Sequence, residues 1–166
     1  MATIPARLTK YLTASKKKYT LVEHKTVFTA YDLGQTLKRK LEEIAKTLLV
    51  KTDTGFTLVV VRANDRLNLV KLKKALGAKK LSIAKEGEMA KTMKVKPGAL
   101  TPFAGLHKLP LVVDRKLTNQ TKVLFGSGSF EHSVEMKMKD FIAIEKPTIV
   151  AFSESAGLKL QVKTKK

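Results

Sequence analysis

The sequence predicts a single α/β domain built around a mixed sheet. Short runs rich in β-branched residues alternate with stretches whose apolar residues recur at helical spacing. Several strand-like runs are joined by hairpin-type turns, and the order is not a regular βαβ alternation, which disfavours a doubly wound parallel sheet. With 43% apolar residues in a chain of 166, the protein can bury one core.

The first part of the chain predicts two helices with a strand between them. Residues 4–15 form an amphipathic helix, residues 16–18 a basic corner, and residues 19–22 a strand. A capping-box pattern at Thr29 and Asp32 opens the second helix. An apolar stripe extends this helix to about residue 45; its members are Leu33, Leu37, Leu41, Ile44 and Leu48.

The middle of the chain predicts a hairpin followed by two short helices. Residues 46–51 and 56–62 form strands on either side of a turn, and the second strand is apolar on both faces and therefore central. Asn68 caps a helix that Gly77 ends. Residues 80–84 form a short strand, and residues 86–93 form a short helix.

The last part of the chain predicts strands joined by irregular segments. The strands are residues 110–114, 122–125, 130–139 and 148–152. In the third of these, Phe130, His132 and Val134 share one apolar face. We assign residues 1–146 to one domain, in which residues 1–18 are an N-terminal helix and basic corner. Residues 147–166 form a C-terminal extension with a basic tail.

The composition excludes several kinds of site. The chain has no cysteine, which removes disulfides, thiolate nucleophiles and thiolate zinc sites. Its three histidines lack metal-ligand spacing, so we expect neither a metal nor a cofactor. No apolar run approaches the roughly 20 residues that span a bilayer, so we expect no transmembrane segment. The acid-free N-terminus has a weak likeness to a mitochondrial presequence, but its helical spacing favours a folded helix, and we expect a cytoplasmic protein.

The net charge indicates a polyanionic partner. The 33 Lys and Arg residues against 14 Asp and Glu residues give a formal charge of +19. Nucleic acid is the usual partner of such a chain, with an anionic membrane surface or simple solubility as alternatives. We expect Lys16, Lys17 and Lys18 to contact phosphates. Aromatic residues are few and no DNA-specific motif is present, which favours contacts with the nucleic-acid backbone.

Lys46 is the first candidate functional residue. It lies where the predicted helix gives way to a strand, and strand alternation places it on the same face as Leu48 and Val50. A lysine among apolar neighbours needs a partner carboxylate, or a phosphate or hydroxyl of a ligand, to offset its loss of water. The alternative is a side chain that follows the apolar surface and keeps its ammonium in water at the strand end.

Three further segments carry candidate binding residues. The loop of residues 98–102 begins with glycine and ends with proline, and it can direct N–H groups at an oxyanion or form a plain connection. The turn of residues 126–129 can line a small polar pocket or form a flexible hairpin, and it lacks the lysine of a P-loop. His132 lies on an apolar face, where a core histidine is more common than a catalyst. No G-x-S-x-G pattern pairs a serine with any histidine.

Together these segments resemble the YbaK/prolyl-tRNA-synthetase-associated domain family, whose members are aminoacyl-tRNA deacylases. The resemblance extends over about residues 19–144 and rests on blocks in the order that the family has. These blocks are the opening segments 19–24 and 27–30, the lysine segment 45–50, the central helix 67–81, the Gly-x-x-x-Pro loop 97–103, and the segments 109–114 and 126–128.

The resemblance implies an editing hydrolase, free-standing or acting with prolyl-tRNA synthetase, that removes a wrong amino acid from the acceptor end of a tRNA. The expected substrate is tRNA-Pro, or a related tRNA, carrying a small wrong amino acid such as Ala or Cys. The implied fold is of the α+β type, with a mixed, curved, mostly antiparallel sheet flanked by helices. Because an aminoacyl ester is already activated, positioning and oxyanion stabilisation suffice, with a water or a substrate hydroxyl as nucleophile. The alternative is a non-catalytic module on the same fold that binds tRNA, other nucleic acid or a synthetase.

By position, the resemblance makes Lys46 the essential lysine, which would hold the phosphate or sugar of the terminal nucleotide. It makes the loop of residues 98–102 the clamp on the aminoacyl carbonyl. Thr47 follows the lysine where some editing branches have asparagine, which leaves the amino-acid specificity open. No metal is implied. The expected substrate contacts are Gly98, Ala99, Leu100, Thr101, Pro102, Gly126, Ser127, Gly128, His132, Tyr19 and His24, with Lys16, Lys17 and Lys18 contacting the tRNA.

Overall fold

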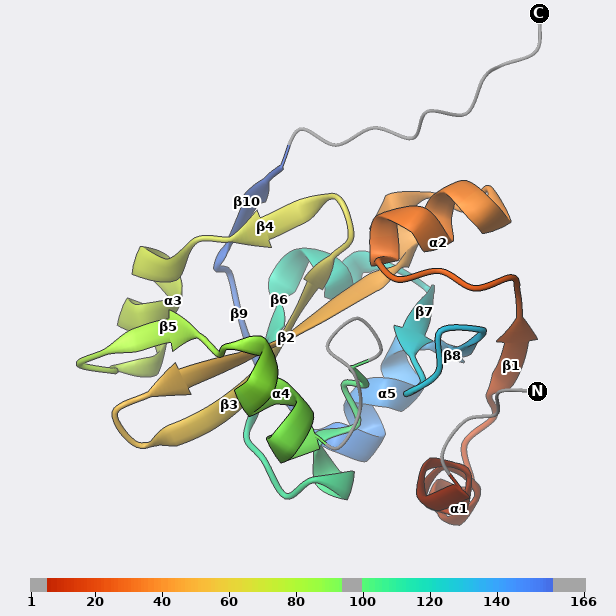
Figure 1. Cartoon of the computed structure of the whole chain (residues 1–166), viewed down its shortest axis with the longest axis horizontal. Coiled ribbons are helices and arrows are strands. Elements are labelled where there is room, and N and C mark those ends of the chain that lie inside the picture. The colour runs from red at the N-terminus through yellow and green to blue at the C-terminus, as the bar shows by residue number, and fades with distance from the viewer. Residues whose placement is uncertain (1–5, 94–99, 157–166) are drawn as a thin grey trace, which may run out of the picture.

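A computed structural model describes residues 6–93 and 100–156, and its central element is a five-stranded mixed sheet (Figure 1). The strands are β2 (Ala45–Thr52), β3 (Gly55–Arg62), β5 (Leu81–Ile83), β6 (Leu111–Asp114) and β9 (Thr148–Val150). They lie in the order β5-β2-β3-β6-β9. Strand β2 is antiparallel to β3 and β5, whereas β6 is parallel to β3 and β9.

Two smaller antiparallel sheets complete the strand set. One has the order β1-β8-β7, and the other pairs β10 with β4; their strands are β1 (Thr20–Glu23), β8 (His132–Lys137), β7 (Lys122–Gly126), β10 (Ser153–Ser155) and β4 (Asp65–Leu67). Of the seven strand pairs among the described residues, five are antiparallel and two are parallel. The predicted α/β class with a mixed, mostly antiparallel arrangement is confirmed, although the strands divide among three sheets.

Five α-helices accompany the strands in the described part of the chain. They are α1 (Ala6–Ser15), α2 (Ala30–Leu37), α3 (Leu69–Leu76), α4 (Glu86–Met93) and α5 (Met138–Glu145). None of the described helices is long and apolar enough to cross a membrane. Helices α1, α4 and α5 contribute buried side chains to the main core, whereas α3 packs on a second cluster.

Strand β3 separates the two hydrophobic clusters of the central sheet. Leu58 and Val60 belong to the main core, whereas Val59 and Val61 pack with Leu72 of α3. These four β3 side chains have 0% exposure, and each such burial contributes about 1.5–3 kcal/mol. The structure therefore confirms that this strand is central, apolar on both faces, and paired with β2 in a hairpin.

The helix caps predicted at Asn68, Gly77 and Thr29 are confirmed. The Asn68 side chain accepts a hydrogen bond from the Lys71 amide at 3.0 Å, and the Thr29 hydroxyl accepts one from the Asp32 amide at 3.0 Å. Gly77 ends α3 with a φ of +64°, a left-handed conformation that glycine adopts without strain. Each cap joins residues close in sequence, which is why local patterns indicate it.

The helix predicted to extend to about residue 45 is wrong. Helix α2 ends at Leu37, because Lys38 adopts a left-handed φ of 55°. A short 3-10 helix, Leu41–Glu43, and then β2 follow. Three of the five stripe residues, Leu33, Leu41 and Ile44, are buried in one core cluster that the chain reaches from different elements. Leu48 packs instead against the cluster on the α3 side of the sheet.

The strand predicted over residues 130–139 is too long. Strand β8 ends at Lys137, and α5 follows at once with Met138 and Phe141 buried at helical spacing. Strands β4 and β10 were not predicted, because neither segment contains a β-branched residue or an apolar alternation. The division of the chain at residue 146 stays a prediction; the structure adds that residues 148–155 form β9 and β10, which pair with β6 and β4.

A half-buried carboxylate joins α1 to α5. Glu145 accepts hydrogen bonds from the Tyr11 hydroxyl at 2.6 Å and from the Gly105 amide at 2.9 Å. Burial raises the pKa of Glu145, and both hydrogen bonds oppose this shift. The pKa of Tyr11 is also raised, first by burial and then by its bond to Glu145.

Replacing Tyr11 with phenylalanine is expected to destabilise the protein by roughly 1–3 kcal/mol at neutral pH. Loss of the Tyr11 hydroxyl leaves the ionised Glu145 with one hydrogen-bond donor fewer and raises the pKa of Glu145 further. A raised carboxyl pKa in the folded state means that ionised Glu145 destabilises the fold. This cost is lost as pH falls through the folded-state pKa, so the destabilisation by Tyr11→Phe should shrink in acid. Urea unfolding of both proteins at about pH 7 and about pH 5 measures this; an equal loss at both values would contradict it.

Candidate active site

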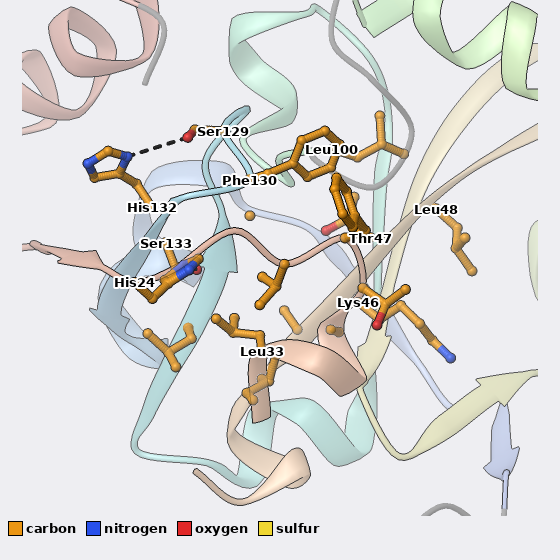
Figure 2. Close-up of a pocket in the computed structure, with 18 of the residues that line it drawn as sticks. His24, Leu33, Lys46, Thr47, Leu48, Leu100, Ser129, Phe130, His132 and Ser133 are labelled. Atoms are coloured by element: carbon orange, nitrogen blue, oxygen red, sulfur yellow. Dashed lines mark hydrogen bonds between the residues drawn. The ribbon is translucent and has the colours of Figure 1, made fainter. Parts of the chain in front are cut away.

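A cavity of about 390 Å³ lies where β2, β7 and β8 meet the segment that leads into α2 (Figure 2). Most of its wall is apolar and comes from Val27, Phe28, Ala30, Leu33, Ile44, Ala45, Leu48, Met89, Leu100, Leu124 and Phe130. The polar and charged side chains that reach it are His24, Thr29, Lys46, Thr47, Glu86, Ser129, His132 and Ser133. An apolar cavity with a few convergent polar groups is the usual form of a ligand site.

Lys46 lines this cavity from β2. Its Nζ donates a hydrogen bond to the backbone carbonyl of Asp65 at 2.5 Å, and Figure 2 shows this end pointing away from His24. The Asp65 carboxylate accepts from Arg62, with 2.7 Å between Nε and Oδ2. Burial lowers the pKa of Lys46, and the charge of Asp65 opposes that shift. The partner of this lysine is therefore a buried carbonyl beside a carboxylate, and an ammonium has two further protons to offer a ligand.

A histidine and a serine meet on the β8 side of the cavity. His24 Nε2 lies 3.0 Å from Ser133 Oγ, and His24 Nδ1 lies 2.9 Å from the carbonyl of Lys25. Because a carbonyl only accepts, Nδ1 carries the proton, and in the neutral ring Nε2 accepts from the Ser133 hydroxyl. No sequence pattern indicates this pair, since it forms only because β1 and β8 are antiparallel, with Val22 opposite Ser133.

Gly126 and Leu100 are in close backbone contact on the cavity wall. A Cβ atom at Gly126 would lie 2.0 Å from the Leu100 carbonyl oxygen, so only glycine permits this approach. Both residues line the cavity. The contact brings the described end of the predicted loop, residues 98–102, against the predicted turn of residues 126–128.

The turn after β7 is held by Ser127. The Ser127 hydroxyl donates to the His132 carbonyl at 2.6 Å and accepts from the Ser129 amide at 3.2 Å. Gly128 has a φ of +88°, which favours glycine. Ser129 and His132 line the cavity, with 3.4 Å between Ser129 Oγ and His132 Nδ1 (Figure 2). Ser127 therefore shapes the turn with its hydroxyl, while its neighbours present side chains to the cavity.

The other predicted site residues lie away from the cavity wall or outside the described residues. Thr101 and Pro102 are buried next to Leu100, and Tyr19 packs against the main core. Thr101, Pro102, Tyr19 and Gly128 are not among the described residues that line the cavity. The basic corner is exposed at the end of α1, at Lys16, Lys17 and Lys18. Gly98 and Ala99 lie outside the described residues, and all these roles stay predictions.

The cavity also contains residues that sequence reasoning missed. Phe28 is 60% exposed, and its ring meets that of Phe130 edge-on with centroids 4.9 Å apart. Thr47 Oγ1 is enclosed and has no hydrogen-bond partner in the described part of the chain. Glu86 places a carboxylate on the wall from α4. For Phe28, the only local indication in the sequence is its position directly before the capping residue Thr29. Within residues 6–93 and 100–156, no group of three or more acidic or histidine side chains is arranged to hold a metal ion.

Sequence comparison identifies relatives of this chain. The model of the aminoacyl-tRNA editing domain matches residues 24–144. The prolyl-tRNA editing protein ProX of Acetoanaerobium sticklandii is 28% identical over 137 residues, which are 79% of this chain and 84% of that protein. The proline–tRNA ligase of Staphylococcus saprophyticus is 36% identical over 108 residues, which are 65% of this chain and 19% of the ligase. The chain thus spans about a fifth of the ligases that it matches.

Solved structures share the fold. The hypothetical protein APE2540 superposes with a TM-score of 0.83 at 24% identity, over 89% of this chain and 99% of that one. A protein proposed to be a trans-editing enzyme for prolyl tRNA synthetase gives a TM-score of 0.79 at 20% identity, over 93% of this chain and all of its own. These likenesses establish the fold. Since the domain model covers most of the sequence, the chain belongs to the aminoacyl-tRNA editing domain family.

Proposed function

We propose that this chain is a trans-editing hydrolase that deacylates mischarged aminoacyl-tRNA. The substrate we favour is tRNA-Pro, or a related tRNA, carrying a small wrong amino acid such as Ala or Cys. The observation that carries the proposal is convergence: Lys46, Leu100 and Gly126, which are far apart in sequence, line one cavity of about 390 Å³ in a chain of the editing family. The matched ProX relative is named for editing prolyl-tRNA.

The residues of the cavity suit ester hydrolysis without a metal. The Lys46 ammonium would hold the phosphate or sugar of the terminal nucleotide. The loop of residues 98–102 would clamp the aminoacyl carbonyl with backbone N–H groups, close to where Leu100 meets Gly126. A water, oriented by a hydroxyl of the substrate, would attack the ester carbon, and the carbonyl oxygen would gain the negative charge. The bond from that carbon to the tRNA oxygen would then break, and this oxygen would leave with the proton lost by the water, which frees the amino acid.

The remaining polar groups would bind and orient the substrate. Thr47 Oγ1 lacks a partner, and an enclosed hydroxyl of this kind is satisfied when a ligand supplies one. His24 and Ser133 form a second polar site across the cavity. The apolar wall around Leu33 and Leu124 suits a small apolar side chain better than a charged one.

Phe28 would support the terminal base. Its ring is 60% exposed at the cavity and is held edge-on by Phe130, which leaves a face free for stacking. Base stacking on an aromatic side chain contributes about 1–3 kcal/mol. We therefore expect Phe28→Ala to raise KM for aminoacyl-tRNA by roughly 10- to 100-fold while kcat changes less.

Steady-state deacylation kinetics measure this effect. Val70→Ala is the matched control, because Val70 is also an exposed apolar residue, at 68%, but lies on α3. An unchanged KM in Phe28→Ala, or an equal rise in both variants, would contradict a stacking role for Phe28.

The rest of the tRNA would bind through charge. The formal charge of +19 favours a polyanion, and we propose that Lys16, Lys17 and Lys18 contact tRNA phosphates. Editing domains occur within proline–tRNA ligases, which makes a synthetase a second partner to consider. Because aminoacyl-tRNA is consumed in translation, we propose a cytoplasmic location.

Deacylation of a panel of charged tRNAs tests the proposal directly. The panel contains Ala-, Ser- and Cys-tRNA-Pro, with correctly charged Pro-tRNA-Pro as the control. Release of one or two wrong amino acids, with Pro retained, is the expected result. No release from any member, together with tight tRNA binding at physiological salt, would instead support the non-catalytic binding module, which the family membership does not favour.

A further inference from the structure

Residues 148–155 follow the segment matched by the family model, yet they are built into the fold beside the site. Strand β9 adds to the central sheet next to β6, and β10 pairs with β4. Phe152, between the two strands, has 0% exposure and belongs to the cluster on the α3 side of the sheet. This stretch therefore has a fixed position relative to β2 and β3 (Figure 1).

Asp114 holds the beginning of β10. Its Oδ1 accepts hydrogen bonds from the amides of Phe152 at 2.9 Å and Ser153 at 3.1 Å. Its Oδ2 accepts from the Ser153 hydroxyl at 2.8 Å and from the Lys116 amide at 3.1 Å. Asp114 is 1% exposed, so its carboxylate depends on these donors, and they in turn fix the chain that supplies them.

Strand β10 is the strand partner of β4 in the described part of the chain. Ser155 lies opposite Asp65, and at the other end the Asn68 amide donates to the Phe152 carbonyl at 2.8 Å. Strand β4 has three residues and carries the carbonyl that accepts from Lys46 Nζ. Strand β10 therefore contributes to holding β4, and with it that carbonyl, alongside the ion pair between Arg62 and Asp65.

We propose that residues 148–155 are a positioning segment for Lys46, holding β4 so that the Asp65 carbonyl fixes the ammonium at the cavity. The inference rests on the proposed function for its catalytic consequence. A lysine side chain has four rotatable bonds, and without the Asp65 acceptor its ammonium would leave this position for water. A misplacement of about 1 Å is enough to cost about 100-fold in rate.

The variant Glu154→Pro, made in the full chain, tests the inference. Proline removes the backbone N–H at the middle of β10 and is incompatible with its pairing to β4. The first readout is an NMR titration of the Lys46 side chain, labelled at Cε, in the absence of tRNA. We expect the pKa of Lys46 to rise toward its ordinary value, because burial is the main cause of its lowering.

The second readout is the pH profile of deacylation. The ammonium form of Lys46 is the active one, so activity falls as pH rises through its pKa. In Glu154→Pro we expect kcat to fall roughly 10- to 100-fold and the alkaline limb to move to higher pH. The charged groups near Lys46 are Asp65 and its partner Arg62, and Glu86 lines the same cavity. The substitution alters none of these three; it removes the exposed Glu154 carboxylate and its ion pair with Arg66.

Two further variants keep the test decisive. Ser153→Ala removes one hydrogen bond to Asp114, and it should shift the Lys46 pKa and the pH profile of deacylation in the same direction but by less. If Glu154→Pro does not fold, Ser153→Ala provides the test. Tyr11→Phe destabilises a region remote from β4 and should leave both readouts unchanged well below its Tm.

An unchanged Lys46 pKa in the folded variants would overturn the positioning role. Because this titration needs no tRNA, the two proposals fail separately. A shifted pKa in a chain without deacylase activity would support the positioning of Lys46 and refute only the proposed function.

Discussion

Replacing Lys46 with alanine is expected to lower kcat/KM for deacylation by about 100- to 1,000-fold. Lys46 is the only lysine or arginine among the described residues that line the cavity, and its ammonium is held by the Asp65 carbonyl at 2.5 Å. Alanine removes the charge that would hold the terminal nucleotide, and no neighbouring cation on the wall replaces it. Single-turnover deacylation of the mischarged tRNA released by the wild type measures the effect.

Lys51→Ala is the matched control for this substitution. Lys51 lies on the same strand and pairs with Glu88 at 3.1 Å, but its side chain is 56% exposed. An exposed ion pair of this kind contributes little to stability, so its loss should leave the deacylation rate within about twofold of the wild type. An active Lys46→Ala variant, or equal losses in both variants, would remove Lys46 from the mechanism.

Replacing Gly126 with alanine is expected to disturb both stability and activity. The new Cβ would lie 2.0 Å from the Leu100 carbonyl oxygen, a backbone atom that moves only if its whole loop moves. We expect a loss of roughly 1–3 kcal/mol in the free energy of unfolding. Because the same loop is the proposed clamp on the aminoacyl carbonyl, we expect kcat to fall at least about tenfold. Thermal unfolding and deacylation kinetics give the two values.

Gly87→Ala separates this clash from a general effect of the substitution. Gly87 lies in α4, and a Cβ there would meet nothing within 4 Å. Alanine in a helix is favoured over glycine by up to about 1 kcal/mol, so this control should be neutral or more stable and fully active. If Gly126→Ala behaved like Gly87→Ala, the contact between Leu100 and the turn would have no role.

The features that the sequence indicated correctly all depend on short-range chemistry. The Asn68 cap and the Gly77 stop follow from residues within one helical turn of each other. The hairpin of β2 and β3 follows from two apolar runs around a turn, and Lys46 was singled out because its alternation with Leu48 placed it among apolar neighbours. The family resemblance added the expectation that the mixed strand arrangement is mostly antiparallel, which the structure confirmed.

The two wrong predictions, the helix to residue 45 and the strand over residues 130–139, arose where buried residues from different elements happen to follow one local period. Leu33, Leu41 and Ile44 pack in one cluster, but Lys38 breaks the backbone between them. No local pattern distinguishes a stripe along one helix from a helix, a turn and a strand that return to the same core. In the same way Met138 continued the alternation of β8 although it begins α5, because a buried residue at a boundary satisfies both periods.

The sequence by itself therefore determined most of the strands, the caps and the family, and it indicated Lys46 as a candidate, since these reside in patterns of neighbouring residues. Only the tertiary structure decided which distant residues share the cavity. His24 meets Ser133 through the antiparallel register of β1 and β8, and Leu100 touches Gly126 because no side chain intervenes. Lys46 meets the Asp65 carbonyl although the two residues are 19 positions apart in the sequence. These contacts are set by strand pairing and close packing across the whole chain, which a one-dimensional pattern does not contain.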